Sequence, residues 1–345
     1  GHGAALGAEA MNALLARLQK HLVWSIPGAM LLGLAFGSLT DASALRWSIL
    51  PLTFLMVYPM MVTMNLRALA APGGLRLQGA ALVINFLVMP AIGWGLGLLF
   101  FAEQPAARLA LLLTALLPTS GMTISWTGFA KGNVPAAVKM TVLGLIAGSL
   151  LAPLYLKALL GAVVEIPVLQ VALQIALIVF LPMALGHLTQ KHLIKRHGQQ
   201  RFNSELKPRF PPWSTLGVLG IVFVSMALKA PDILRSPQLL VTLLWPLVLM
   251  YALNFTLSTL VGRALFQRGD AIALLYGTAM RNLSIALAIA IGVFREQGAD
   301  AALLIALAYI VQVQAAAWSV RWTDRVFGAA PTPPATATQP PITKA

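Results

Sequence analysis

Long apolar runs, separated by short polar segments, repeat along almost the whole chain. A transmembrane helix needs about 20 mainly apolar residues. Segments that meet this requirement lie at 22–39, 46–64, 77–101, 107–130, 134–157, 167–190, 213–230, 238–266, 271–294 and 300–322. The connections between them are short and contain Pro, Gly or charged residues, as turns do. The pattern predicts an all-α membrane protein of about ten transmembrane helices.

Composition agrees with a surface that faces lipid. Hydrophobic residues make up 59% of the 345 residues and charged residues only 10%, whereas a soluble domain carries about 25% charged residues. The net charge is +14, but the basic residues lie in loops and form no aromatic-interleaved patch, which excludes nucleic-acid binding. The absence of cysteine excludes disulfides and thiolate metal sites, and the sequence predicts no metal site and no cofactor.

The distribution of basic residues predicts the orientation. Most of the 24 lysines and arginines precede the first span, follow the even-numbered spans or follow the last one. Six lie on the opposite side, namely Arg46, Arg108, Lys157, Lys229, Arg235 and Arg295. Because basic loops stay in the cytoplasm, we expect both termini to be cytoplasmic, in the cytoplasmic (inner) membrane of a bacterium or archaeon.

Two short motifs indicate an internal repeat. Asn85 is followed by Phe86 and, eight residues after the asparagine, by Gly93; Asn254 is followed by Phe255 and Gly262 at the same interval. These motifs lie five spans apart, and an odd number of spans per half inverts one half relative to the other. The predicted organisation is a leader or tag-like segment at 1–21, five-helix repeats at 22–160 and 167–325, and a disordered Pro/Thr-rich tail at 326–345.

Span 4 contains a helix-breaking sequence. Pro118 removes a backbone hydrogen bond, and Gly121 permits further unwinding. The neighbouring hydroxyls are candidates to bind a solute, namely Thr119, Ser120, Thr123 and Ser125. One interpretation is a discontinuous helix whose freed backbone groups bind solute. The alternative is a simple proline kink, with the hydroxyls bonding back to their own helix.

Span 9 carries a second group of polar residues, in which Gly277 is the candidate helix break. The candidate binding residues here are Thr278, Arg281, Asn282 and Ser284. A charged group at membrane depth is costly unless it is paired or hydrated, so Arg281 is a functional candidate. The alternative is an arginine near a helix end whose side chain reaches the headgroups.

Three more intramembrane residues are candidates. Lys139 in span 5 either reaches the headgroups or points inward, where burial makes a lysine a usable proton carrier. Asn85 and Asn254 brace the broken helices or fix helix packing by hydrogen bonds between helices. No Asp or Glu lies inside a span. Deep charges that are all positive suit an anion, or a neutral solute rich in acceptor oxygens.

Several stretches resemble a known family. Residues 117–123, Leu-Pro-Thr-Ser-Gly-Met-Thr, and 129–134, Phe-Ala-Lys-Gly-Asn-Val, resemble the fourth helix and following turn of the bile acid:sodium symporter superfamily. Residues 56–61 and 285–294 are more similar to its arsenical-resistance (arsenite efflux permease) branch. The resemblance implies two inverted five-helix repeats, a core domain of spans 3, 4, 5, 8, 9 and 10, and a panel domain of the other four. The broken helices would cross at mid-membrane, with substrate between core and panel.

The match to the sodium-coupled branch is partial. Thr141 matches a family threonine ligand, but Thr123 and Ile124 stand in place of a serine–asparagine pair. Ala137 stands in place of a serine. In span 9, Gly277 replaces a carboxylate and Arg281 replaces a glutamine. We therefore expect that Arg281, with or without Lys139, takes the place of the sodium ions as a built-in cation.

The match to the arsenical-resistance branch also departs at two positions. Thr119 replaces a cysteine that follows the span 4 proline, and Ser284 aligns with a glutamate. Capture of arsenite by a thiolate is excluded, whereas binding of its neutral hydroxide species through hydroxyl groups remains open.

The sequence contains no catalytic motif and no phosphate-binding loop, so we expect neither an enzyme nor a primary pump. The expected function is secondary active transport of a small solute by alternating access, without classical sodium coupling. The solute would be an organic anion or a metalloid oxyacid such as arsenite or antimonite. The alternatives are a passive channel or facilitator and a sodium-dependent organic-anion symporter. The expected partners are the small-molecule substrate and the lipid bilayer, with proton or sodium coupling and oligomeric state left open.

Overall fold

The structure, a computed structural model, describes residues 2–330, and this part of the chain consists of helices joined by short loops, without a β-strand. The α-helices are α1 His2–Lys20, α2 Leu22–Leu39, α3 Ile49–Thr63, α4 Leu75–Val83, α5 Met89–Phe100, α6 Pro105–Leu116, α7 Gly121–Phe129, α8 Val134–Leu160, α9 Val168–Ile175, α10 Leu181–His197, α11 Gln199–Arg201, α12 Pro211–Arg235, α13 Gln238–Leu265, α14 Arg268–Ala279, α15 Leu283–Val293, α16 Arg295–Ser319 and α17 Thr323–Phe327. Short 3-10 and π segments complete the chain, namely η1 Ala42–Ser48, η2 Leu66–Ala70, η3 Ile84–Val88, η4 Ala176–Phe180, η5 Phe202–Leu206 and η6 Lys207–Arg209.

The prediction of an all-α membrane protein is confirmed. Within the described residues, 8 helical stretches are long and apolar enough to cross a membrane. Two shorter apolar helices, α6 and α15, belong to predicted spans 4 and 9, each of which is interrupted in its middle. In spans 3 and 6 the π-helical segments η3 and η4 join two α-helices into one long rod. The hydrophobic pattern therefore located every span. The two interrupted spans differ from the other 8 only in the break at their middle.

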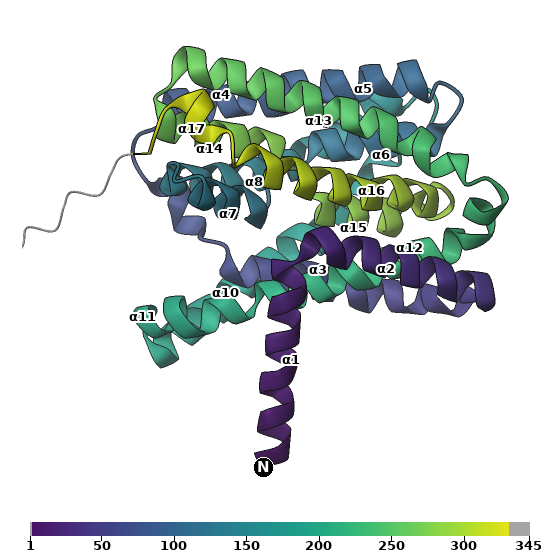
Figure 1. Cartoon of the computed structure of the whole chain (residues 1–345), viewed down its shortest axis with the longest axis horizontal. Coiled ribbons are helices and arrows are strands. Elements are labelled where there is room, and N and C mark those ends of the chain that lie inside the picture. Colours follow the sequence, from purple (N-terminus) through teal and green to yellow (C-terminus); the bar gives the residue numbers. More distant parts are fainter. Residues whose placement is uncertain (1, 331–345) are drawn as a thin grey trace, which may run out of the picture.

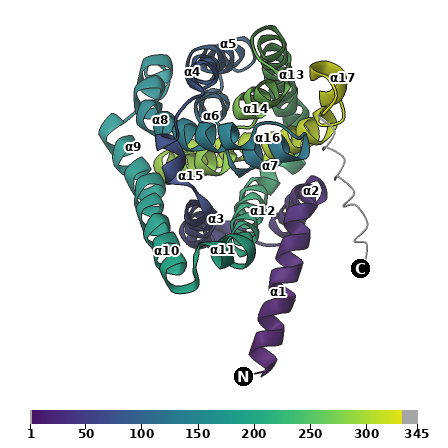
Figure 2. The same cartoon turned by 90° about the vertical axis from the view of Figure 1, so that its left-hand side faces the viewer.

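The helices form two packed groups (Figures 1 and 2). We call α2, α3, α9, α10 and α12 the panel group, in which α12 packs against both α2 and α3 and α10 packs against α3. We call α4–α8 and α13–α16 the core group, in which α5 packs on α6, α13 on α14 and α15 on α16. The two groups meet where α12 and α2 lie against α16, where α9 lies against α8 and α15, and where α3 lies against α15. This is the division that the sequence resemblance implied.

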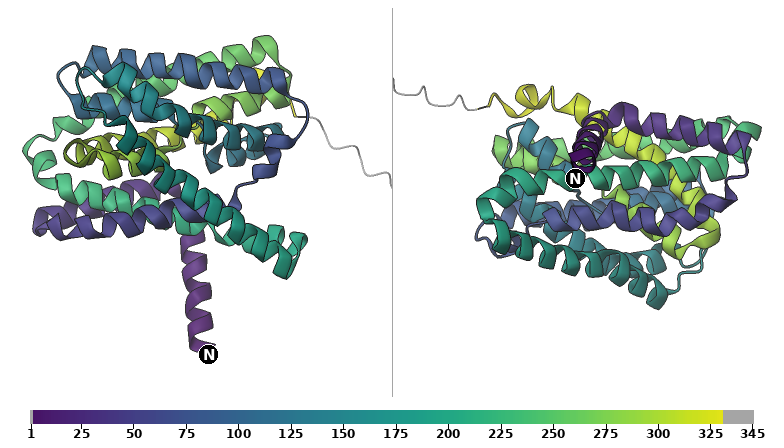
Figure 3. Two further views of the ribbon diagram at one scale, coloured as in Figure 1. Left: turned by 180° about the vertical axis from the view of Figure 1, so that it is seen from behind. Right: turned by 90° about the horizontal axis from the view of Figure 1, so that it is seen from below.

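The two ends of the chain lie apart from this helical body. Helix α1, in the segment predicted as a leader, projects away from the bundle and touches α12 and α2 through its C-terminal end (Figures 1 and 3). Its Leu15 is buried. Of the tail predicted to be disordered, 326–327 belong to α17, and the part from 331 onward lies outside the described residues.

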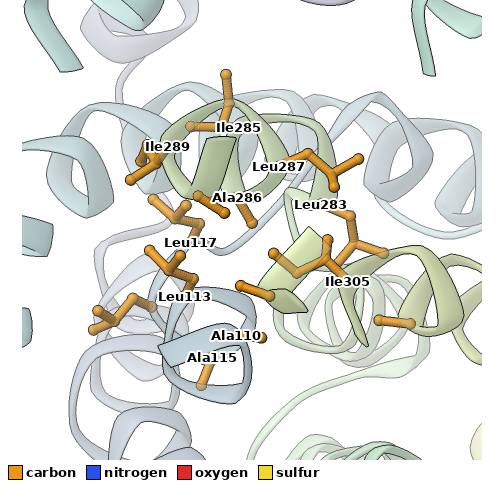
Figure 4. Close-up of a cluster of buried hydrophobic side chains, with 14 of the residues drawn as sticks. Ala110, Leu113, Ala115, Leu117, Leu283, Ile285, Ala286, Leu287, Ile289 and Ile305 are labelled. Carbon is orange, nitrogen blue, oxygen red and sulfur yellow. The ribbon is translucent and has the colours of Figure 1, made fainter. Parts of the chain in front are cut away.

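The interior of the core group is aliphatic around the middle of the interrupted helices. Figure 4 shows Leu113 and Leu117 at the end of α6 facing Ala286 and Ile289 of α15, with Ile305 of α16 beside them. All five side chains are buried. This packing excludes water from one side of the interruption, so polar groups freed there need protein partners.

Close packing in the panel group yields a first prediction. A Cβ added to Gly37 of α2 would lie 2.1 Å from the backbone oxygen of Ala227 in α12, so one helix must move. Gly37→Ala should therefore destabilise the protein by about 1–3 kcal/mol, the usual cost of overpacking. Gly28→Ala on the same helix is the matched control, because a Cβ there meets nothing within 4 Å. Thermal unfolding of both variants in detergent measures the difference, and equal midpoints would contradict it.

Candidate functional site

The two interrupted helices meet at their breaks. The amide of Thr119 donates to the carbonyl of Met280 at 2.8 Å, and the amide of Asn282 donates to the carbonyl of Leu117 at 2.7 Å. Pro118 and Arg281 pair as a small antiparallel bridge. Each break thus supplies hydrogen-bond partners to backbone groups that the other break leaves free. Lipid could not supply such partners. The prediction of two discontinuous helices that meet is confirmed. The prediction of Gly277 as the break in span 9 is wrong, because α14 continues through it to Ala279 and the chain leaves the helix at Met280.

Local sequence explains why both helices stop and restart here. Pro118 removes a helical donor, and Thr119 adopts the left-handed region with φ 63, which ends α6. Ser120 then caps α7, because its hydroxyl accepts from the amide of Met122 and Thr123 closes a capping box. Asn282 caps α15 in the same way by accepting from the amide of Ile285 at 3.1 Å. Side-chain caps of this kind satisfy the free amides of a helix start.

Arg281 lies at the junction and is fully buried, with 0% of its surface exposed. Its guanidinium donates to the carbonyls of Thr114 at 3.1 Å and Ala115 at the end of α6, and to the carbonyl of Thr278 at 2.8 Å near the end of α14. It also donates to Oδ1 of Asn85 at 2.6 Å. The C-terminal ends of helices carry partial negative charge. The guanidinium therefore neutralises two helix ends that face each other inside the bilayer.

Further side chains hold this junction. Asn85 donates to the carbonyl of Gly277 at 3.0 Å, and Asn254 donates to the carbonyl of Thr278 at 2.7 Å. The side chain of Gln312 accepts from the amide of Arg281 at 2.8 Å and donates to its carbonyl at 3.2 Å. Of the two alternatives for the asparagines, these bonds to the end of α14 favour bracing of the break in span 9.

We call the place where the two interrupted helices meet, at 117–120 and 280–282, the crossing. A cavity of about 330 Å³ adjoins the crossing on the side of the predicted cytoplasmic loops. We call it the inner cavity. It lies between the helix starts of α7 and α15, helix α8, the end of α3, and the connection from α10 to α12. Its polar lining consists of Thr63, Asn65, Ser120, Ser125, Thr141, Asn203, Lys207 and Asn282.

A larger cavity of about 1330 Å³ lies on the opposite side of the crossing, between the panel group and helices α15 and α16. We call it the outer cavity. Its walls are mostly aliphatic, and Arg46, Lys229 and Gln174 are among its polar residues. On α15 the outer cavity is lined by Ala288, Ile291 and Gly292, beyond the crossing, whereas the inner cavity is lined by Ser120 and Asn282 at the crossing itself.

The predicted binding residues separate into two sets. The first lines the inner cavity and consists of Ser120, Ser125, Thr141 and Asn282. The second lines neither cavity and consists of Thr119, Thr123, Thr278, Arg281, Asn85, Asn254 and Ser284. All of the second set bond to protein groups; Thr123, for example, donates to the carbonyl of Tyr276 at 3.1 Å, and Ser284 pairs with Tyr309. Direct contact with solute is therefore not supported for the second set in this conformation, because their polar atoms hold the crossing together.

Lys139 requires a correction. Its ammonium donates to the carbonyl of Ala71 at 2.6 Å and to that of Gly73 at 3.3 Å, in the loop before α4. It lies at the membrane edge and does not line the inner cavity. The inward orientation is wrong, and with it the roles of proton carrier and second built-in cation at the crossing.

Sequence reasoning missed Asn65, Asn203 and Lys207. They lie in connections rather than in spans, and the basic residues of 191–212 served only as evidence of orientation. The signal was the unusual length of this connection, since a loop that folds back toward a cavity needs more residues than a tight turn.

Comparison with known proteins identifies the family. The model of the Sodium Bile acid symporter family matches residues 50–236, which include the break in span 4 and most of the panel group. The chain belongs to this family. Together with the apolar spans, family membership makes the chain an integral membrane transporter.

Individual relatives of this symporter family member are distant. The Arsenical-resistance protein Acr3 of Corynebacterium glutamicum is 23% identical over 236 residues, which cover 65% of this chain and 64% of that protein. The matched region thus spans less than two thirds of that relative. The Arsenical-resistance protein Acr3 of Alkaliphilus metalliredigens is 24% identical over 70% of this chain and 73% of its own length. An uncharacterised transporter of Synechocystis is 24% identical over 80% of each chain.

Proposed function

We propose that this protein is a secondary active transporter of a compact, oxygen-rich solute, either a metalloid oxyacid such as arsenite or antimonite or a small organic anion. It works by alternating access between the inner and outer cavities. The proposal rests on one observation. The interrupted helices α6–α7 and α14–α15 meet at their breaks, and the guanidinium of Arg281 is held there by hydrogen bonds. The relatives named for arsenical resistance support the metalloid as the first solute to test.

The chemistry of the crossing favours oxygen-rich solutes. The starts of α7 and α15 carry partial positive charge, and their caps Ser120 and Asn282 line the inner cavity. The ends of α6 and α14 are neutralised by Arg281. The combined field is therefore positive where the cavity meets the crossing. With no cysteine in the chain, arsenite would bind through hydrogen bonds to its oxygens rather than through thiolate bonds.

The same guanidinium argues against obligatory sodium coupling. In transporters with broken helices, freed carbonyls and helix C-terminal ends bind the coupling cation. Here the carbonyls at the ends of α6 and α14 already bind Arg281. A sodium ion placed among them would have to displace a fixed positive charge. Transport would then be coupled to protons or left uncoupled.

Counterflow in liposomes tests the proposal. Purified protein is reconstituted and loaded in turn with arsenite, antimonite, acetate or glycolate, and exchange of the same labelled solute is followed with and without a sodium gradient. We expect saturable exchange of at least one of these solutes at rates that ignore sodium. Strict dependence on a sodium gradient would contradict the coupling, and flux that neither saturates nor exchanges would indicate a passive facilitator.

Orientation is a separate part of the proposal. With the N-terminus and the α10–α12 connection in the cytoplasm, the inner cavity opens to the cytoplasm and the outer cavity to the outside. For arsenite the expected direction is export, because resistance requires a lower cytosolic concentration. Labelling of a single cysteine introduced at exposed Lys195 by an impermeant reagent in intact cells and in inverted vesicles tests the orientation, and labelling in intact cells would contradict it.

A further inference from the structure

The inner cavity has one charged lining residue among the residues described, Lys207 in the 3-10 turn η6. This side chain is half-buried. The ion pairs found within 2–330 are formed by other basic residues, namely Arg201, Lys229 and Arg268. No carboxylate lines the described part of this cavity. The ammonium of Lys207 is therefore a cation held beside a solute-sized space without an acidic partner among these residues.

The wall contributed by the core group supplies hydrogen-bond donors. The hydroxyl oxygen of Ser120 accepts from the amide of Met122 at 3.2 Å, and Oδ1 of Asn282 accepts from the amide of Ile285 at 3.1 Å. Capping thus uses one lone pair of each of these oxygens, and each side chain keeps a donor for a solute, the hydroxyl hydrogen of Ser120 and the side-chain amide of Asn282. The hydroxyls of Thr63 and Thr141, which also line the cavity, donate to the carbonyls of Met60 and Ala137. The lining therefore offers donors and acceptors together with one ammonium, and the ammonium favours a solute that carries negative charge and acceptor oxygens.

The position of Lys207 places it across from these donors. Ser120 and Asn282 belong to the core group, whereas Lys207 belongs to the connection between panel helices α10 and α12. That connection contains the buried Phe202, and two prolines restrict its backbone, Pro208 within η6 and Pro211 at the start of α12. Its backbone is therefore held in place at the mouth of the cavity. A solute in the cavity meets the core group on one side and Lys207 on the other.

We propose that Lys207 is a solute-contacting residue that makes the inner cavity specific for compact monoanions with acceptor oxygens. This rests on the proposed transport function and narrows its substrate class. A volume of about 330 Å³ lies at the lower end of ligand pockets, roughly 300–1000 Å³, and fits a solute of a few heavy atoms. A deprotonated metalloid oxyacid and a short carboxylate share this chemistry.

Binding to the purified full-length protein tests the assignment. The solutes are arsenite, antimonite, acetate and glycolate, with acetamide as a neutral counterpart of acetate, each titrated by calorimetry at constant pH. In Lys207→Ala we expect the affinity for the bound anion to fall about 10-fold, which corresponds to about 1.4 kcal/mol. Lys207→Arg should retain most of the affinity. Lys195→Ala is the matched control, because Lys195 is exposed on the preceding helix and does not line the cavity.

Salt dependence separates direct contact from a structural role. Wild-type affinity for the anion should weaken as ionic strength rises, and the dependence should be smaller in Lys207→Ala because one screened attraction is gone. Unchanged affinity in Lys207→Ala would overturn the assignment, as would an equal loss in Lys195→Ala. If wild type binds none of the anions, the assignment also fails. Counterflow is read independently: anion binding that depends on Lys207 without exchange would overturn the transport proposal and leave the anion site standing.

The order of the measured affinities shows whether the solute is a deprotonated metalloid oxyacid or a short carboxylate. Tighter binding of arsenite or antimonite than of acetate and glycolate would indicate a metalloid oxyanion, and the reverse order a short carboxylate. Raising the pH by one unit increases the anionic fraction of arsenite but leaves acetate fully ionised. A rise in arsenite affinity in wild type that is absent in Lys207→Ala would therefore identify the deprotonated oxyacid as the bound species.

Discussion

Arg281→Gln should produce a transporter whose stability and transport depend on sodium, whereas the wild-type protein should ignore that ion. The guanidinium lies among four oxygens, the carbonyls of Thr114, Ala115 and Thr278 and Oδ1 of Asn85. Glutamine is shorter and neutral, so it leaves both a space and unpaired oxygens at two helix ends. Hard cations bind in clusters of oxygen ligands of this kind. A free sodium ion should enter where the fixed cation has been removed.

The expected size of the effect is large. Removing one partner from a buried charged network costs about 3–5 kcal/mol, because the other groups stay buried without a partner. We therefore expect Arg281→Gln to unfold at a clearly lower temperature in choline chloride, and sodium chloride at the same ionic strength to restore much of the loss. Arg281→Leu should be destabilised at least as strongly but should not respond to sodium, because its bulky side chain fills the space and supplies no ligand.

A matched control removes a different cation, one that lies away from the crossing. Lys139→Gln also loses one positive charge but acts at the loop carbonyls of Ala71 and Gly73, away from the crossing. It should show no sodium response in unfolding or in counterflow. Equal midpoints of Arg281→Gln in sodium and in choline would refute the idea that the guanidinium occupies the place of a coupling ion, and a strong sodium response of the wild type would do the same.

The sequence predicted which residues belong to this site better than it predicted the contacts that those residues make. Pro118 predicted the break in span 4, because a mid-span proline has few structural explanations in lipid. Arg281 marked the functional region of span 9, but the break predicted there, Gly277, lies inside α14. The sequence did not show which oxygens the guanidinium binds, since Thr114 and Ala115 look like ordinary positions in an apolar helix. Their carbonyls become ligands only because α6 ends two residues later, and the backbone, not the side chain, supplies the oxygen.

Two other residues show why the remainder could not be predicted. The sequence left open whether Lys139 reaches the headgroups or points inward. The side chain of a lysine is long enough to reach a loop, and where that loop lies is decided by tertiary packing. Lys207 belongs to the basic connection that served as evidence of orientation, and the folding of that connection back over a cavity leaves no periodic signal in the sequence. The inverted relation between the two five-helix halves remains a prediction.

Joining the two helix groups at their outer edge should stop transport without unfolding the protein. Lys229 of α12 in the panel group forms an ion pair with Asp300 of α16 in the core group, and Lys229 also lines the outer cavity. If alternating access moves the panel group relative to the core group, a covalent link here should hold the outer cavity in one state. The chain contains no cysteine, so introduced thiols are the only ones present.

The double variant Lys229→Cys/Asp300→Cys, linked with a short bis-methanethiosulfonate reagent, should lose nearly all counterflow and regain it when a reductant cleaves the link. The matched control is Lys229→Cys/Asp232→Cys, since Lys229 and Asp232 lie 3.6 Å apart on the same helix and a link within one helix leaves the two groups free to move. Mass spectrometry measures the extent of linkage in each. If the fully linked α12–α16 variant still exchanges solute at the rate of its reduced form, the two groups do not separate at this edge, and movement between them is not how the cavities alternate.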